Sequence, residues 1–182
     1  MATKNGPWTV LGSAIKYENA WMTVREDKVI HPHGKPGVYG VVSFPPGISV
    51  LPIDKSGDVH LVEEFRYAIQ RNSIECCSGA MDGRETPLDC AKRELEEELG
   101  IAAKDWVSLG SVVPLTGNIE TPAYLFLARK LMFTKAHPEG SEVITPVKMP
   151  LDKAVKMVME SKIVHAPSCV LIMKAKTYLE KR

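Results

Sequence analysis

The strongest local constraint on the fold lies in residues 79–101, which read GAMDGRETPLDCAKRELEEELGI. Thr86 suits the N-cap of a helix, Pro87 its first position and Asp89 a capping box. Gly100 supplies the left-handed residue with which helices commonly end. The helical repeat places four apolar residues in one stripe, namely Leu88, Ala91, Leu95 and Leu99. The segment therefore predicts a capped amphipathic helix that packs on a core.

Four carboxylates crowd the C-terminal half of this helix, at Glu94, Glu96, Glu97 and Glu98. Like charges three and four residues apart repel, and the helix dipole disfavours anions near its C-terminus. A hard divalent cation removes both penalties, because Mg²⁺ and Mn²⁺ bind clustered oxygen ligands. Arg93 flanks Glu97 closely enough to orient its carboxylate. A solvated acidic face is the alternative interpretation of such a helix.

Composition limits the class of protein. A chain of 182 residues with 45% apolar content can form one compact domain. Its 23 basic and 22 acidic residues give a net charge of +1, and no basic run is interleaved with aromatics, so a nucleic acid polymer is not an expected partner. No apolar run approaches the roughly 20 residues that span a bilayer, and MATKNGPW is unlike a signal peptide. We expect a cytoplasmic protein without a membrane partner.

The four cysteines are Cys76, Cys77, Cys90 and Cys169. They have no C-x-x-C spacing and no nearby histidine that would complete a zinc site. Because adjacent strand residues point to opposite faces, Cys76 and Cys77 should enter opposite sides of a sheet. Reduced packing residues are the expected role of all four.

The N-terminal part predicts three strands, at residues 8–16, 20–30 and 37–44. Three strands are too few for an independent core. They must therefore pack on the main domain, on a second subunit, or on both. The Pro-Pro-Gly stretch at 45–47 marks a boundary, which divides the chain into an N-terminal β region, 1–45, and a main domain, 46–182.

The main domain predicts alternating strands and helices. Residues 48–53 and 59–65 are expected to form a hairpin, and 74–77 a short strand before the Gly79 loop. Further strands are expected near 106–113, 123–129 and 142–149, followed by helices over 151–161 and 167–181. This order predicts an α/β fold, an α/β/α sandwich with a mixed sheet, in addition to the small N-terminal antiparallel sheet.

The 79–101 segment has the spacing Gly, five residues, Glu, seven residues, Arg-Glu-apolar-any-Glu-Glu-any-Gly-apolar. It is similar to the Nudix box at every fixed position, a coincidence expected on the order of once in 10⁸ starts. Residues 17–42, the strand LVEEFRYAI, PEGSE and MPLDKAV also resemble the ADP-ribose and nucleoside-diphosphate-sugar pyrophosphatase branch of the Nudix hydrolases. The resemblance implies an α/β/α sandwich and a homodimer that exchanges its N-terminal strands and shares a substrate pocket.

The resemblance also implies a metal site and its supports. Glu94, Glu97 and Glu98 match metal-binding carboxylates, and the carbonyl of Ser78 or Gly79 would complete the ligand set. Glu85 and Arg93 would hold the loop and orient those acids. The expected metal is Mg²⁺, with Mn²⁺ as an alternative.

The general base of this branch comes from a loop beyond the sheet, where Glu142 of PEGSEV matches, with Glu139 as the second choice or a substrate contact. A solvent-exposed loop acid is the alternative for Glu142. Arg66 resembles a substrate-contacting arginine, for which a structural ion pair is the alternative. Glu120 lies in a loop usually written Ser-Asp-Glu. Trp21, like Trp8 and Tyr17, is a candidate to stack on a nucleobase, with packing or dimer contact as the alternative for each.

The implied reaction is magnesium-dependent hydrolysis of the pyrophosphate bond in a small nucleotide, ADP-ribose or another nucleoside diphosphate linked to a sugar. The products would be a nucleoside monophosphate and a sugar phosphate. The family's Glu-Leu-Pro-Ala-Gly is replaced here by Glu75-Cys-Cys-Ser-Gly79, so ADP-ribose is not assigned as the sole substrate. Two alternatives remain: a pyrophosphohydrolase that removes damaged nucleoside triphosphates, and a regulatory module that binds a nucleotide sugar without cleaving it.

Overall fold

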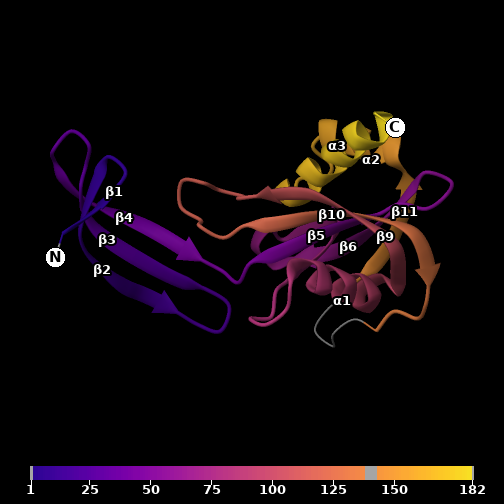
Figure 1. The fold of residues 1–182 in the computed structure, drawn as a ribbon, viewed down its shortest axis with the longest axis horizontal. Coiled ribbons are helices and arrows are strands. Elements are labelled where there is room, and N and C mark those ends of the chain that lie inside the picture. Colours follow the sequence, from indigo (N-terminus) through magenta and orange to yellow (C-terminus); the bar gives the residue numbers. More distant parts are fainter. Residues whose placement is uncertain (1, 138–142, 182) are drawn as a thin grey trace. The chain divides into compact units, whose positions relative to one another are not determined.

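The computed structural model describes residues 2–137 and 143–181. The chain divides into two compact units (Figure 1). The first, here called the N-terminal unit, comprises Met1–Pro45 and Val113–Thr121. The second, the sandwich unit, comprises Pro46–Val112 and Pro122–Arg182. A loop from the middle of the sequence thus belongs to the N-terminal unit.

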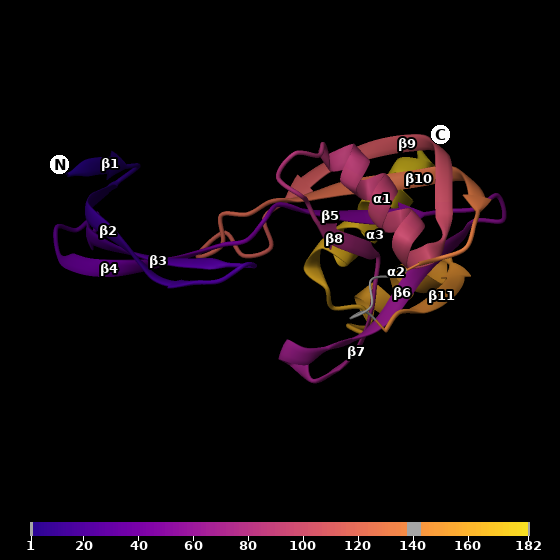
Figure 2. The same ribbon diagram turned by 90° about the horizontal axis from the view of Figure 1, so that it is seen from below.

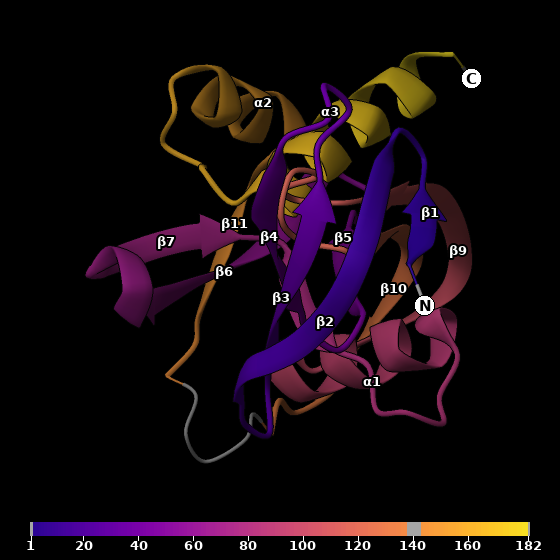
Figure 3. The ribbon, with the colours of Figure 1, turned by 90° about the vertical axis from the view of Figure 1, so that its left-hand side faces the viewer.

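The N-terminal unit is built on one antiparallel sheet (Figure 3). Its strands, in spatial order, are β1 (Thr3–Asn5), β2 (Trp8–Glu18), β3 (Thr23–Ile30) and β4 (Pro36–Ser43). The small N-terminal antiparallel sheet predicted from the sequence is therefore present. The loop 113–121 lies along β4, because Val42 forms a parallel bridge with Ile119 and its N–H donates to the Asn118 carbonyl at 2.8 Å.

The sandwich unit contains two sheets (Figure 2). The larger has the order β8 (Cys77–Ala80), β5 (Gly47–Pro52), β10 (Ala123–Phe133), β9 (Ile101–Val112). The smaller has the order β11 (Thr145–Pro150), β6 (Asp58–Arg66), β7 (Arg71–Glu75), with the short 3-10 helix η1 (Tyr67–Ile69) joining β6 to β7. The β5–β10 pair is parallel and the other pairs are antiparallel. The larger sheet is mixed, as predicted.

The hairpin predicted over 48–53 and 59–65 forms only at its turn, where the Asp54 N–H donates to the Asp58 carbonyl at 2.9 Å. Strands β5 and β6 enter different sheets and share only the bridge between Ile53 and Val59. The reason is burial: five of the six residues of β5 are buried, so this strand occupies the middle of its sheet with β8 and β10 on its two sides. Strand β10 pairs along the whole of β5 and β8 along Gly47–Val50, so most of both edges of β5 is already occupied.

In the described part of the chain, three helices cover the sheets: α1 (Pro87–Leu99), α2 (Leu151–Met159) and α3 (Ala166–Glu180). Alternate residues of β5 enter two separate apolar clusters, because successive strand residues point to opposite faces. One cluster joins Leu51 to residues of α2 and α3, and the other joins Val50 to residues of α1. Figure 1 shows α1 on one side and α2 with α3 on the other. The predicted α/β/α sandwich is confirmed.

The cysteines follow the same layering. Cys76 belongs to the α3 cluster and Cys77 to the α1 cluster, on opposite faces as predicted. All four cysteines are free.

Strand β9 begins earlier than expected, since Gly100 ends α1 and the next residue, Ile101, already pairs with Phe133. Across residues 2–137 and 143–181, no helix has the length and apolar character needed to cross a bilayer.

Candidate active site

The site is built on helix α1, whose ends are fixed as predicted. Thr86 Oγ1 accepts a hydrogen bond from the Asp89 N–H at 3.2 Å and donates one to Asp89 Oδ2 at 2.7 Å. Gly100 adopts a left-handed conformation, φ 60°, and its N–H donates to the Glu96 carbonyl. The stripe of apolar residues packs into the cluster beneath the larger sheet. This anchoring fixes which face of the helix carries the carboxylates.

Arg93 is the centre of the carboxylate array. Its Nη1 donates to Glu94 Oε1 at 2.8 Å and to Glu97 Oε2 at 3.0 Å. Its Nη2 donates to Glu85 Oε1 at 2.8 Å, and Nε to Glu85 Oε2 at 3.3 Å. One guanidinium thus joins three acids that come from two segments of the chain. Glu98 points to the more buried side, where the residue is 6% exposed.

The pairing with Arg93 fixes the charge states of this array. The Arg93 guanidinium lowers the pKa of Glu85 to about 2. In return, Glu85 first and then Glu94 raise the pKa of Arg93 above its usual value. The Asp82 N–H also donates to Glu85 Oε1 at 2.8 Å. Glu85 therefore ties the loop before α1 to the helix.

The loop from β8 approaches Glu94 closely. A Cβ added to Gly79 would lie 2.0 Å from Glu94 Oε1, so only glycine leaves room for this carboxylate. The Ser78 hydroxyl donates to the Cys76 carbonyl at 2.8 Å and shares a hydrogen bond with Ser49 at 2.7 Å. The Ser78 side chain is thus engaged within the sheet, where Ser78 and Gly79 pair with Ser49 and Ile48 of β5.

The donor set fits a hard divalent cation in chemistry. Glu94, Glu97 and Glu98 offer carboxylate oxygens from one stretch of helix, and Gly79 of β8 lies against the Glu94 carboxylate. Within the described part of the chain, no three histidine, cysteine or acidic side chains are already gathered around a metal position. Arg93 holds one oxygen of Glu94 and one of Glu97, and the second oxygen of each carboxylate is the one that could bind a cation.

Glu98 places negative charge near the core. Burial raises the pKa of the Cys77 thiol well above its usual value, and the Glu98 carboxylate raises it further. The thiol therefore stays neutral, and Cys77 is a packing residue beside the acid. A cation bound at this end of α1 would compensate the negative charge of the Glu98 carboxylate.

Arg66 is held by two acids. Its Nε and Nη2 donate to the two oxygens of Glu75 at 3.2 and 2.7 Å, and Nη1 lies 2.8 Å from Glu64 Oε2. The structural ion pair considered from the sequence is thus present. Burial lowers the pKa of Arg66, but Glu75 and Glu64 outweigh that effect and the net pKa is raised. The side chain remains 37% exposed.

Sequence reasoning did not single out the supports behind Arg66. Glu75 Oε2 lies 3.4 Å from His165 Nδ1, and that nitrogen is 2.8 Å from Ser168 Oγ. The Ser168 hydroxyl also accepts from the Cys76 N–H at 2.8 Å. Glu75 was visible in the pattern before the box, but His165, which precedes α3, and Ser168 in its first turn lie about ninety positions further along the chain. No local sequence signal links them.

The other predicted site residues are distributed differently. Glu120 lies in the N-terminal unit, where Ser43 Oγ donates to its Oε1 at 2.5 Å and Arg25 Nη1 lies 3.8 Å from its Oε2. Trp21 lies before β3 in the same unit and is 74% exposed. Glu139 and Glu142 fall outside the described residues.

Comparison with protein families places this site in a known class. A model described as the NUDIX domain matches residues 43–164, which is two thirds of the chain. A model described as the nucleoside diphosphate sugar hydrolase N-terminal domain matches residues 8–42. The chain belongs to the Nudix family and is a Nudix hydrolase.

Individual proteins of named activity and one solved structure are also similar to this chain. An ADP-ribose pyrophosphatase from Bacillus subtilis (strain 168) is 27% identical over 143 residues, covering 78% of this chain and 77% of its own length. A GDP-mannose pyrophosphatase from Yersinia pestis (strain Pestoides F) is 27% identical over 133 residues, covering 68% and 67%. A crystal structure of a protein called an ADP compounds hydrolase matches with a TM-score of 0.83 at 18% identity, covering 98% and 97% of the two chains.

Proposed function

We propose that this protein hydrolyses the pyrophosphate bond of a nucleoside diphosphate linked to a sugar, with Mg²⁺ as the metal and Mn²⁺ as a substitute. The products are a nucleoside monophosphate and a sugar phosphate. The observation that carries the proposal is the Arg93-centred array, in which three acids meet one guanidinium beside a glycine that leaves room for Glu94. Relatives named for ADP-ribose and GDP-mannose support this substrate class.

Glu94, Glu97 and Glu98 are the residues proposed to hold the metal, with the carbonyl of Ser78 or Gly79. A divalent cation bound there would neutralise part of the pyrophosphate charge and would lower the pKa of a water molecule that it coordinates. Their shared helix keeps the three acids on one rigid element, as a metal site requires.

Arg93 and Glu85 are positioning residues in this proposal. Glu85 binds Nε and Nη2 of the guanidinium, so that Nη1 is directed at Glu94 and Glu97. Because both acids start from a fixed orientation, the entropy lost when they bind a cation is reduced. Loss of Glu85 would remove two of the hydrogen bonds that fix the guanidinium and would make the positions of Glu94 and Glu97 less well defined.

Arg66 is proposed to contact a substrate phosphate. Glu75 fixes the plane of the guanidinium, and the raised pKa keeps it charged. A guanidinium held in this way offers its outward N–H groups to phosphate oxygens. Glu142 is proposed as the general base, with Glu139 as the second choice or as a substrate contact. Trp21 and Glu120 are proposed substrate contacts.

We also propose a homodimer in which the second copy covers the N-terminal sheet. Exposed large apolar residues gather in this unit, namely Leu11, Ile15, Tyr17, Trp21, Val38, Phe44, Val113 and Leu115. An excess of exposed large apolar residues is what a surface that binds another protein would provide. Light scattering on the 20.1 kDa chain should give twice the monomer mass, and a monomer at all concentrations would reject the dimer.

The reaction is tested by incubating the protein with Mg²⁺ and a panel of ADP-ribose, GDP-mannose, other nucleotide sugars, dinucleoside polyphosphates and nucleoside triphosphates. Alkaline phosphatase is added only to the reactions with sugar diphosphates and releases phosphate from the products, because it acts on the monoester products and not on the intact sugar diphosphates. Release from the sugar diphosphates supports the proposal. Preference for triphosphates, detected by pyrophosphate release, would favour the nucleotide-cleansing alternative, and binding without turnover would favour the regulatory module.

Two observations rank the alternatives below the proposal. All the box acids are present, Glu85 before α1 and the others on it, which argues against a module that has lost catalysis. The match of residues 8–42 to the N-terminal domain of nucleoside diphosphate sugar hydrolases favours sugar diphosphates over triphosphates.

A further inference from the structure

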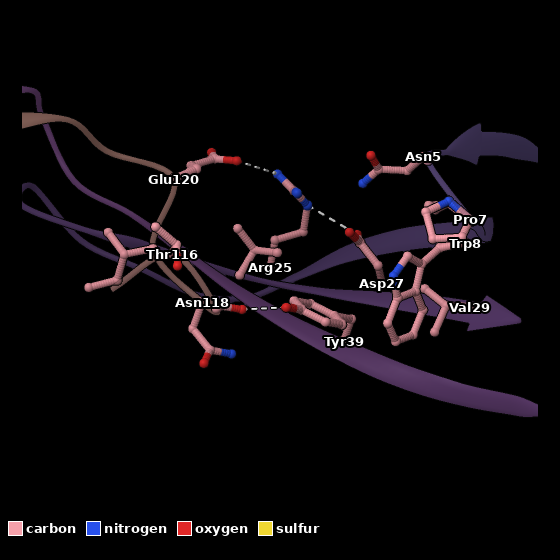
Figure 4. Close-up of a pocket in the computed structure, with 15 residues that line it drawn as sticks. Asn5, Pro7, Trp8, Arg25, Asp27, Val29, Tyr39, Thr116, Asn118 and Glu120 are labelled. Carbon is pink, nitrogen blue, oxygen red and sulfur yellow. Dashed lines mark hydrogen bonds and ion pairs between the residues drawn. The ribbon is translucent and has the colours of Figure 1, made fainter. Parts of the chain in front are cut away.

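Two arginine–carboxylate pairs of this chain differ in what lies behind the carboxylate. Arg25 Nε donates to Asp27 Oδ1 at 3.0 Å in the wall of a cavity of about 420 Å³, which the N-terminal sheet forms with the 113–121 loop (Figure 4). A serine hydroxyl, which carries no charge, is a further partner of Asp27. In the sandwich unit Arg66 donates to Glu75, and there a histidine ring lies against the same carboxylate. The charge around the second pair can therefore change near neutral pH.

One oxygen of Glu75 is shared between two nitrogens. Arg66 Nη2 donates to Oε2 at 2.7 Å, and His165 Nδ1 lies 3.4 Å from the same oxygen. The other oxygen, Oε1, accepts from Arg66 Nε at 3.2 Å. Glu75 is 4% exposed, so water competes little for the carboxylate. The strength of its bond to Arg66 therefore depends on what His165 does.

The Nδ1 atom of His165 has two partners within reach. Ser168 Oγ lies 2.8 Å from it, and this buried hydroxyl already accepts from the Cys76 N–H. A neutral imidazole with its proton on Nε2 accepts the Ser168 proton at Nδ1. A protonated imidazole has a proton on Nδ1, which it can donate to Glu75 Oε2. Protonation of the ring thus adds a second cationic donor to the oxygen that Arg66 Nη2 uses.

The groups around His165 favour its neutral form. Burial lowers the pKa of His165; Glu75 opposes this effect and Arg66 adds to it, so the net pKa lies below the ordinary 6.5. The thiols of Cys76 and Cys169 stay neutral, because burial raises the pKa of each. The His165 side chain is 30% exposed, so protons can reach it from solvent.

Protonation of His165 favours an anion at Arg66 for two reasons. One guanidinium and the two carboxylates of Glu64 and Glu75 carry a formal charge of −1, which one added proton brings to zero. Glu98 of α1 adds further negative charge that acts on Arg66. In addition, a hydrogen bond from the imidazolium to Glu75 Oε2 weakens the hold of this oxygen on Arg66 Nη2. The N–H groups of Nη2 then become available to a phosphate oxygen.

We propose that His165 is a proton-linked positioning residue for Arg66: its protonation releases Arg66 from Glu75 towards a substrate phosphate. The inference rests on the proposed function, in which Arg66 contacts that phosphate. Binding of the substrate must in turn favour protonation of His165, because two coupled binding events change each other's affinity by the same factor. The protein should therefore bind a nucleotide sugar more tightly as the pH falls below 6.5.

The first test follows the imidazole signals of the unmodified protein by NMR in EDTA, from about pH 8 to about pH 5.5. ADP-ribose and GDP-mannose are added separately, since neither ligand changes its own charge over this range. Bound ligand should raise the proton affinity of His165 about fivefold. His60, which lies 3.2 Å from Asp54 in the same unit, is the internal reference. An unchanged His165 titration with both ligands, or an equal change at His60, would overturn the proposal.

A variant then separates proton linkage from packing. In the wild type, the KM for a hydrolysed sugar diphosphate should fall about fivefold between about pH 8 and about pH 5.5 relative to His165→Asn, which cannot titrate. His60→Asn is the matched control, because it also removes an imidazole beside a carboxylate, and it should keep the wild-type profile. A purely structural role would change KM by one factor at every pH, and that result would reject the linkage. If His165→Asn fails to fold, the titration of the unmodified protein decides.

The two proposals fail separately. A ligand-dependent His165 titration without hydrolysis of any diphosphate would reject the proposed reaction and leave the linkage standing. Hydrolysis of sugar diphosphates with an unchanged His165 titration would reject the linkage and leave the reaction standing.

Discussion

The two units of this chain differ in where their apolar side chains lie. Of 26 buried apolar residues in the described chain, 25 belong to the sandwich unit and Val29 alone to the N-terminal unit. The N-terminal unit nevertheless has eight of the 17 exposed large apolar residues, although it is much the smaller unit. The sandwich unit is stabilised by its own core. The N-terminal sheet is held by strand pairing and leaves its apolar surface uncovered.

The difference in burial suggests different roles for the two units: the sandwich unit provides the stable framework, and the N-terminal unit provides surface for binding. Helix α1 carries the acids on a face whose reverse side is buried in the core, so the hydrolytic residues are fixed by packing. The N-terminal unit instead presents polar and aromatic side chains around a cavity and apolar ones to the outside. We therefore expect changes in the sandwich unit to affect turnover or folding, and changes in the N-terminal unit to affect association and ligand choice.

The largest effect is expected for a substitution of Glu98, the buried acid of α1, and it tests whether turnover depends on this carboxylate. Glu98→Gln should lower kcat by about 10³-fold or more, because a neutral amide is a poor ligand for a divalent cation. Glu96→Gln is the matched control, since Glu96 is exposed on the same helix and is outside the proposed ligand set. Steady-state kinetics with Mg²⁺ measures both. Near-normal turnover in Glu98→Gln would remove Glu98 from the metal site.

The second prediction tests the contrast in burial directly. Leu125 is fully buried in the sandwich unit, so Leu125→Ala should lower the free energy of unfolding by about 3 kcal/mol at any protein concentration. Ile15 is 54% exposed in the N-terminal unit, and its contacts are proposed to lie between copies. Ile15→Ala should therefore lower the thermal midpoint more in concentrated than in dilute protein. A concentration-independent loss in Ile15→Ala would contradict the proposed interface.

The third prediction concerns the approach of the β8 loop to α1. Gly79→Ala should lower kcat about tenfold to 100-fold, because the new methyl group displaces the Glu94 carboxylate. The fold should survive, since the displaced atoms are the end of a flexible side chain. Gly83→Ala is the control, because a Cβ there meets no atom within 4 Å. Equal kinetics in the two variants would show that the position of Glu94 is not critical.

The predictable parts of this molecule were those set by local sequence. Thr86, Pro87 and Gly100 fix the ends of α1 through contacts within a few residues, and the apolar stripe fixes its buried face. The layer order followed from the alternation of strands and helices. The contacts of β5 and β6 could not be predicted from local sequence. The choice between a hairpin and two separate sheets depends on β8 and β10, which lie far along the chain.

The candidate site divides in the same way. The spacing of the box placed Glu85, Arg93 and Glu97 in one group, and their hydrogen bonds bring them together. The pairing of Glu75 with His165 was missed because the two residues are distant in sequence. The Arg25–Asp27 pair in the cavity was also missed. In the sequence it has the pattern of ordinary charges on a strand, and only the 113–121 loop encloses it in a cavity.

The smallest effect is expected for Glu85 in the loop before α1, and it tests how much the charge of this carboxylate contributes to stability. The pKa of Glu85 is about 2, below its ordinary value of 4.5, because Arg93 stabilises the ionised carboxylate. This contribution to stability should be fully present above pH 4.5 and be lost as the pH falls through 2. It should amount to about 1 kcal/mol, since solvent screens the pair. Urea unfolding of wild type and Glu85→Gln in EDTA, from pH 7 to pH 3, should show the two curves converging with acid. A gap that stays constant across this range would mean that Glu85 stabilises the loop by packing and not by its charge.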